Sequence, residues 1–148
     1  MKVYDLLSPT DVMIDILAPD KRLLLQEIAT RAAVSLGLGH NQVAVHLLKR
    51  EELGSTGIGW GAAVPHARLP DLQQPYGLLA KLKKPIEFDA IDGLPVDIVF
   101  VLLLPAAEHR QLGALALVVR TLRKPENLFR LRGAKNAPEL YSAMADSM

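Results

Sequence analysis

The stretch Ile98-Val99-Phe100-Val101-Leu102-Leu103-Leu104 decides the fold class, because every one of its residues is apolar. A strand with one face in water alternates apolar and polar residues, whereas a strand covered on both faces is apolar throughout. The run is much shorter than the roughly 18 apolar residues of a membrane-spanning helix, and Pro105 ends it. We therefore expect a central strand over residues 98–104, covered on both faces.

Helices and further strands alternate along the chain around this run. Asp20 predicts the start of a helix over 21–36 that Gly37 ends, and Asn41 predicts the N-cap of a second helix that stops at Gly54. Residues 1–20 are expected to form a terminal arm with a short strand or turn, and two more strands are expected over 62–64 and 76–82. Two further helices are expected over 107–122 and around 126–132. A last helix is expected to begin at Asn136, because Asn136 and Glu139 have the spacing of a capping box. This alternation predicts an α/β layered fold, and the length predicts one domain over residues 1–148.

Composition excludes several classes of function. The net charge of +1 gives no bulk attraction to nucleic acid or to a membrane surface. The chain contains no cysteine, so it has no disulfide, no thiolate nucleophile and no zinc site of the cysteine type. A signal peptide requires a positively charged segment followed by an apolar block, and the N-terminus shows no such pattern. We expect a soluble, cytoplasmic protein with neither nucleic acid nor membrane as a partner.

The candidate site lies in the stretch Gly54-Ser55-Thr56-Gly57-Ile58-Gly59-Trp60-Gly61, which leads through Ala62-Ala63-Val64-Pro65 to His66. Four glycines in eight residues allow backbone conformations that other residues resist. Ser55 and Thr56 add hydroxyl donors, and the N–H groups of such a loop can surround an anion. The pattern predicts an imidazole at a strand end, facing an anion-sized pocket. The alternative is a histidine whose ring tip simply lies in water.

Two more residues complete a phosphate-handling hypothesis. A neutral imidazole is nucleophilic near pH 7, so His66 could accept a phosphoryl group and give it up again. His109 falls in the first turn of the helix expected after Pro105, where its protonated ring could hydrogen-bond that phosphate; the alternative is an exposed surface histidine. Arg50 could fork onto the same phosphate, or form an ordinary helix-end cation or ion pair.

Other constellations carry less weight. Ser55 and His66 could join an aspartate in a hydrolase triad, but no nucleophile-elbow pattern surrounds the serine. No residues have metal-ligand spacing, and we expect neither a metal nor a cofactor. Basic residues interrupted only by Glu126 fill the C-terminal third: Arg120, Arg123, Lys124, Arg130, Arg132 and Lys135. These basic residues could simply lie on the solvent-exposed faces of two helices. The functional alternative is that they bind an acidic surface of a partner protein.

Three segments together resemble a known family: Arg50-Glu51-Glu52-Leu53-Gly54-Ser55-Thr56-Gly57-Ile58-Gly59 leading to Ala63-Val64-Pro65-His66, the segment from Ile86 to Phe100, and Pro105 through Glu108-His109. The family is that of the IIA components of the bacterial phosphoenolpyruvate-dependent phosphotransferase system, in its fructose/mannitol branch, and the nitrogen-regulatory type is most similar. The resemblance implies a compact α/β domain with a mixed sheet flanked by α-helices.

The resemblance also implies roles for single residues. His66 would be the phosphorylated residue, with the small phosphocarrier HPr or its nitrogen-branch counterpart as donor. His109 would support the phosphate, and Arg50, Ser55 and Thr56 match family positions near the site. The sequence departs from the family pattern at Trp60, where a small or polar residue such as asparagine is usual, and at Arg110 and Gly113.

Three functions compete at this stage. The first is a phosphoryl carrier of the nitrogen-regulatory type, whose two phosphorylation states bind different regulatory targets. The second is a sugar-specific IIA component that passes phosphate to a IIB partner, and the third is a binding module that is not phosphorylated. The oligomeric state stays open, with a homodimer as one option.

Overall fold

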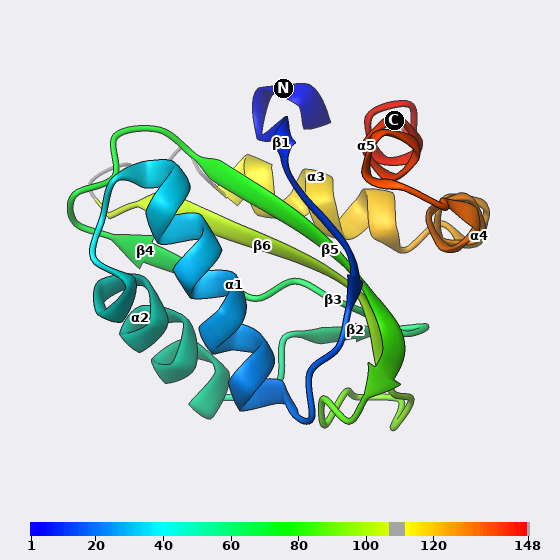
Figure 1. Ribbon diagram of the computed structural model, residues 1–148, viewed down its shortest axis with the longest axis horizontal. Coiled ribbons are helices and arrows are strands. Elements are labelled where there is room, and N and C mark those ends of the chain that lie inside the picture. Colours follow the sequence, from blue (N-terminus) through cyan, green and yellow to red (C-terminus); the bar gives the residue numbers. More distant parts are fainter. Residues whose placement is uncertain (107–111, 148) are drawn as a thin grey trace.

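The computed structural model describes residues 1–106 and 112–147, which form one mixed sheet between two layers of helices (Figure 1). Strand β6 (Val96–Pro105) lies at the centre and runs antiparallel to β5 (Tyr76–Ile86). On its other side β6 pairs in parallel with β3 (Ala62–Ala63) and β4 (His66–Leu69). The outer strands are β1 (Leu7–Ile16), parallel to β5, and β2 (Gly57–Gly59), antiparallel to β3. The mixed sheet that the family resemblance implied is thus confirmed.

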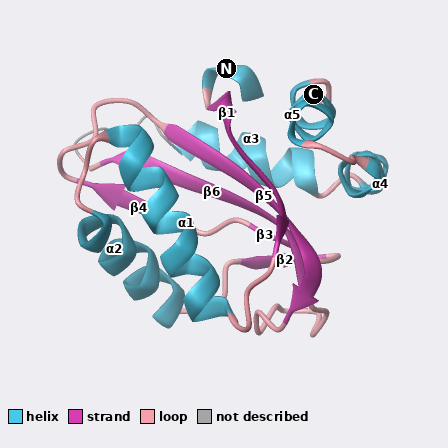
Figure 2. Ribbon diagram, viewed as in Figure 1, coloured by secondary structure: helices cyan, strands magenta, loops and turns pink. Residues whose placement is uncertain are grey.

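Helices cover both faces of this sheet, as Figure 2 shows. On one face lie α1 (Lys21–Leu36) and α2 (His40–Glu52), and on the other lie α3 (Leu112–Leu122), α4 (Pro125–Gly133) and α5 (Ala137–Ala145). A short 3-10 helix, η1 (Val3–Asp5), precedes β1. None of the helices within residues 1–106 and 112–147 has both the length and the apolar character of a membrane-spanning segment.

Alternate residues of β6 belong to two separate cores. Ile98, Phe100, Leu102 and Leu104 pack in the cluster that includes α3, α4 and α5. Val99, Val101 and Leu103 pack in the cluster that includes α1 and α2. Every residue of β6 except Asp97 is buried. The central strand predicted from residues 98–104 is confirmed, and its apolar run exists because helices cover both of its faces.

Helix α1 has the predicted bounds, and its predicted caps are present. The Asp20 carboxylate accepts a hydrogen bond from the N–H of Leu23 at 2.8 Å, and Gly37 ends the helix at φ 69°. The prediction for α2 is wrong at its start, because Gly39 is the N-cap and Asn41 lies inside the first turn. At its other end the helix stops directly before Gly54, with Leu53 as the C-cap.

The N-terminal arm also differs from its prediction, because most of it is strand β1. Pro9 and its exposed neighbours break the apolar alternation that marks a strand. An edge strand tolerates a proline, and the pairing of β1 with β5 shifts register between Leu7 and Val12. Strand β4 was likewise not predicted, and β5 runs four residues past its predicted end at Leu82, to Ile86.

The C-terminal helices agree with the sequence prediction where the structure describes them. Residues 112–122 are helical, whereas the expected helix start at 107–111 lies outside the described residues, and His109 lies there too. The Asn136 side chain caps α5 by accepting from the N–H of Glu139 at 2.9 Å. The Glu139 carboxylate accepts from Lys135 rather than from Asn136, so the predicted capping box forms only in part.

Candidate functional site

His66 is the first residue of β4, directly after a break in the strand line beside β6. Strands β3 and β4 both pair with β6, and Pro65 separates them because it has no N–H to donate. The Pro65 carbonyl still accepts from Leu102 at 2.9 Å, so the break is anchored. Ala67 and Leu69 point into the core, which leaves His66 partly exposed on the other side of the strand.

The backbone fixes the tautomer of the His66 ring. Its Nδ1 lies 2.9 Å from the Val64 carbonyl oxygen. A carbonyl can only accept, so Nδ1 carries the proton in this contact. The neutral ring then has its lone pair on Nε2, which no described residue hydrogen-bonds. Nε2 is therefore the nucleophilic nitrogen.

The surroundings of the ring favour its neutral form. Burial lowers the pKa of His66 below its ordinary value of 6.5, and the guanidinium groups of Arg50 and Arg68 lower it further. The hydrogen bond to Val64 and the carboxylate of Glu51 raise the pKa, but the net change is downward. His66 is thus neutral at pH 7 and able to attack an electrophile.

His66 lies in a hollow of about 690 Å³ whose lining is rich in cations. The C-terminal half of α2 and strand β4 supply most of its wall, and the lining residues are His46, Lys49, Arg50, Glu52, Leu53, His66, Ala67, Arg68, Leu104 and Leu115. The Arg50 side chain donates to the Gly54 carbonyl at 2.9 Å and so braces the start of the glycine stretch. The structure therefore brings Arg50 and His66 to one hollow.

Ser55 and Thr56 are held differently. The Ser55 hydroxyl donates to the Phe88 carbonyl at 2.6 Å, and the Thr56 hydroxyl donates to Glu51 at 2.6 Å. Thr56 is buried, and neither residue lines the hollow of His66. Both hydroxyl protons have protein acceptors, so direct phosphate binding would require each of them to change its partner. Their predicted phosphate-binding role stays a prediction.

Glu51 holds the glycine stretch in place, a role that no sequence motif predicted. Its buried carboxylate accepts from the Thr56 N–H at 2.8 Å, from the Thr56 hydroxyl, and from Lys21 at 3.1 Å. Lys21 also donates to the Phe88 carbonyl at 2.9 Å. The pair thus ties the start of α1 and the end of α2 to the loop that leads to His66.

Two lining residues could have been found from their spacing. His46 is one helical turn before Arg50, and residues four apart share a helix face. Arg68 is two residues after His66, and such residues share a strand face. The expected strand stopped before His66, so this second relation was missed. His109 lies outside the described residues.

A family model described as "Phosphoenolpyruvate-dependent sugar phosphotransferase system, EIIA 2" matches residues 5–147. The chain belongs to this family. A nitrogen regulatory protein of Bradyrhizobium diazoefficiens is 40% identical over 148 residues, which cover 98% of this chain and 95% of that protein.

Solved structures agree with this assignment. The crystal structure of nitrogen regulatory protein IIA-Ntr from Neisseria meningitidis has a TM-score of 0.90 and 29% identity, and the match covers 96% of this chain and 98% of that one. The IIA mannitol enzyme of Escherichia coli, in its complex with phosphorylated IIB mannitol enzyme, has a TM-score of 0.80 at 16% identity, and the match covers 95% of this chain and 99% of that one. This second similarity is one of fold alone.

Proposed function

We propose that this chain is a phosphoryl carrier of the nitrogen-regulatory type, and that His66 carries the phosphoryl group on Nε2. One observation carries the proposal: the Val64 carbonyl holds the Nδ1 proton, which leaves Nε2 with its lone pair beside the cations of a surface hollow. A neutral nucleophile near positive charge is what acceptance of a phosphoryl group requires.

The transfer step needs no further reactant. The donor is the phosphohistidine of a small HPr-like phosphocarrier. The Nε2 lone pair forms the new N–P bond while the donor's N–P bond breaks, and the donor imidazole keeps that electron pair. The guanidinium groups of Arg50 and Arg68 lie where they can offset charge on the transferred group. His109 is the second histidine of the site in this proposal.

The phosphorylated state would serve as the output. A phosphohistidine adds close to two negative charges to the cationic hollow, which changes the partner surfaces that fit it. Similarity to nitrogen regulatory proteins supports regulatory targets in the cytoplasm as partners. Passage of the phosphate to a IIB partner is the second candidate, because the mannitol IIA enzyme of similar fold was solved in complex with IIB.

Intact-mass measurement after incubation with phosphoenolpyruvate, the general phosphotransferase enzyme and the phosphocarrier tests the proposal. We expect the wild type to gain one phosphoryl group and His66→Ala to gain none. His40→Ala is the matched control, because His40 is exposed, lies outside the hollow of His66 and should leave phosphorylation intact. A wild type without added mass, or His66→Ala with it, would refute the proposal.

A further inference from the structure

Trp60 occupies a backbone position that is unfavourable for it. It forms, with Gly61, the two-residue turn between β2 and β3, and both residues have positive φ, 60° and 81°. A type I′ turn requires positive φ at both positions and favours Asn-Gly, because asparagine tolerates this conformation better than an aromatic residue. A tryptophan kept at such a position points to a function for its side chain.

The turn is held rigidly. Asp92 accepts from the Trp60 N–H at 2.8 Å, and the Trp60 carbonyl accepts from Arg132 at 2.5 Å. Asp97 fixes the same arginine through a forked pair of hydrogen bonds. A Cβ at Gly61 would collide with the Arg132 side chain, so the second turn residue is also restricted. Hydrogen bonds thus hold the Trp60 backbone from both sides, while the residue stays 65% exposed.

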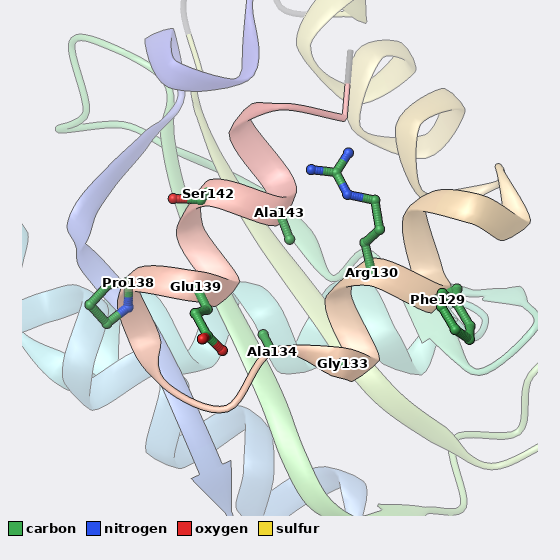
Figure 3. Close-up of a pocket in the computed structure, with 8 residues that line it drawn as sticks. All are labelled: Phe129, Arg130, Gly133, Ala134, Pro138, Glu139, Ser142 and Ala143. Atoms are coloured by element: carbon green, nitrogen blue, oxygen red, sulfur yellow. The ribbon is translucent and has the colours of Figure 1, made fainter.

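Trp60 borders an apolar hollow at the edge of α4. Its lining comprises Trp60, Leu94, Pro125, Leu128, Phe129 and Arg132, and none of these residues lines the hollow of His66. Phe129 is 81% exposed, so two large aromatic side chains face solvent at one place. Phe129 and its neighbour Arg130 also line a second hollow, between α4 and α5 (Figure 3). Adjoining exposed apolar surface of this kind marks an interaction site.

The charges beside the hollow favour an acidic occupant. Arg123 and Lys124 immediately precede Pro125, both are exposed, and neither side chain pairs with a carboxylate of the described residues. The two acids that contact Trp60 or Arg132 have partners already, since Asp92 accepts from Trp60 and Leu94, and Asp97 binds Arg132. Residues 120–135 include six basic residues and only one acidic residue, Glu126.

We propose that the hollow between Trp60 and Phe129 docks an acidic segment of another protein, which inserts an apolar side chain beside Trp60 while its carboxylates meet Arg123 and Lys124. A preordered aromatic group is suited to this role, because little conformational freedom is lost when the partner binds. The site is separate from His66, so binding does not depend on phosphorylation of that residue. The proposal stands on its own contacts and not on the phosphoryl-carrier function.

Trp60 is the only tryptophan of the chain, so its fluorescence reports on this site alone. The probe is a short labelled peptide in which leucine and phenylalanine alternate with glutamate. We expect binding of the peptide to shift the Trp60 emission to shorter wavelength. The anisotropy of the peptide label should rise on binding, and this rise should become smaller as salt is added. Two comparison peptides replace glutamate by lysine or the apolar residues by serine, and we expect neither to bind.

Variants locate the interaction. Trp60→Asn suits the turn and should stay folded, as circular dichroism would show, yet lower peptide affinity about tenfold. Arg123→Glu with Lys124→Glu should lower it to a similar extent. The matched controls are Tyr4→Asn, an aromatic residue exposed to 59%, and Lys83→Glu with Lys84→Glu, an adjacent exposed cation pair; both should bind normally. His66→Ala should also bind normally, which separates this test from that of the carrier function.

Four results would overturn the proposal. The first is equal binding of the lysine peptide, the second is no binding of the glutamate peptide, and the third is undiminished affinity in folded Trp60→Asn. The fourth is a concentration-dependent dimer in sedimentation that Trp60→Asn dissociates, because the occupant would then be a second copy of this chain.

Discussion

At His66 a backbone carbonyl, rather than a carboxylate side chain, orients the imidazole. The Val64 oxygen accepts the Nδ1 proton at 2.9 Å, and burial together with Arg50 and Arg68 keeps the ring neutral. A protonated ring has no lone pair on Nε2 and cannot attack phosphorus. If His66 carries the phosphoryl group as proposed, its lowered pKa decides the lower pH limit at which phosphate can be accepted.

The first prediction concerns the titration of His66. Followed by NMR, its midpoint should lie below 6.5, and phosphate acceptance should fall as the pH drops through that midpoint. Arg50→Gln should raise the midpoint, because it removes a cation that disfavours the charged ring. Arg22→Gln, at an exposed cation on α1, should not change the midpoint. A midpoint above 6.5 in the wild type, or no response to Arg50→Gln, would contradict this account.

At the scale of elements, a chain of hydrogen bonds connects α2 to His66 through the glycine stretch. The Glu51 carboxylate accepts from the Thr56 N–H, the Thr56 carbonyl accepts from Val64 at 3.0 Å, and the Val64 carbonyl accepts from His66. Lys21 joins the same carboxylate from the first turn of α1. Glu51 is therefore a positioning residue: it orients His66 through the backbone between them, and its carboxylate charge also raises the pKa of the ring.

The second prediction is that Glu51→Ala both destabilises the fold and loosens the ring of His66. It leaves the Thr56 donors and Lys21 without their buried acceptor, which should lower the free energy of unfolding by about 3 kcal/mol in urea titrations. Nitrogen NMR shifts of His66 should show less of the form protonated at Nδ1. The exposed neighbour serves as control: Glu52→Ala should change stability by under about 0.5 kcal/mol. If Glu51→Ala lowers the stability but leaves the His66 tautomer unchanged, Glu51 stabilises the fold without positioning the His66 ring.

At the scale of the whole molecule, strand β5 must let β1 and β6 approach closely for the two helical layers to share one sheet. Gly77 lies at the point of contact, and its N–H donates to the Leu6 carbonyl at 2.7 Å. A Cβ there would lie 2.8 Å from that same oxygen and 2.8 Å from the Phe100 ring. The N-terminal strand can therefore dock only because residue 77 lacks a side chain.

The third prediction follows from this contact. Gly77→Ala should lower the free energy of unfolding by about 1–3 kcal/mol, because the backbone of β1 and a buried ring must move. Gly133→Ala is the matched control: no atom lies within 4 Å of its added Cβ, and it ends α4, so stability should be unchanged or slightly higher. Thermal unfolding of both variants measures the difference. Equal melting temperatures of Gly77→Ala and Gly133→Ala would contradict the prediction, because they would show that β1 can pack against a side chain at residue 77.

Features that depend on neighbouring residues could be predicted from the sequence. The apolar run at 98–104 required a strand with two covered faces, Asp20 and Gly37 delimited α1, and the glycines before His66 indicated a shaped loop. Each of these follows from periodicity or from local backbone preference, which a sequence displays directly.

Contacts between residues far apart in the sequence became known only from the folded chain. Lys21 and Glu51 are 30 residues apart, and Ser55 and Phe88 are 33 apart, so no local pattern could reveal these contacts. The same holds for Arg132, which meets Trp60 from 72 residues away. The physical reason is that a hydrogen bond depends on position in space, and the packing of the two helical layers on one sheet sets that position.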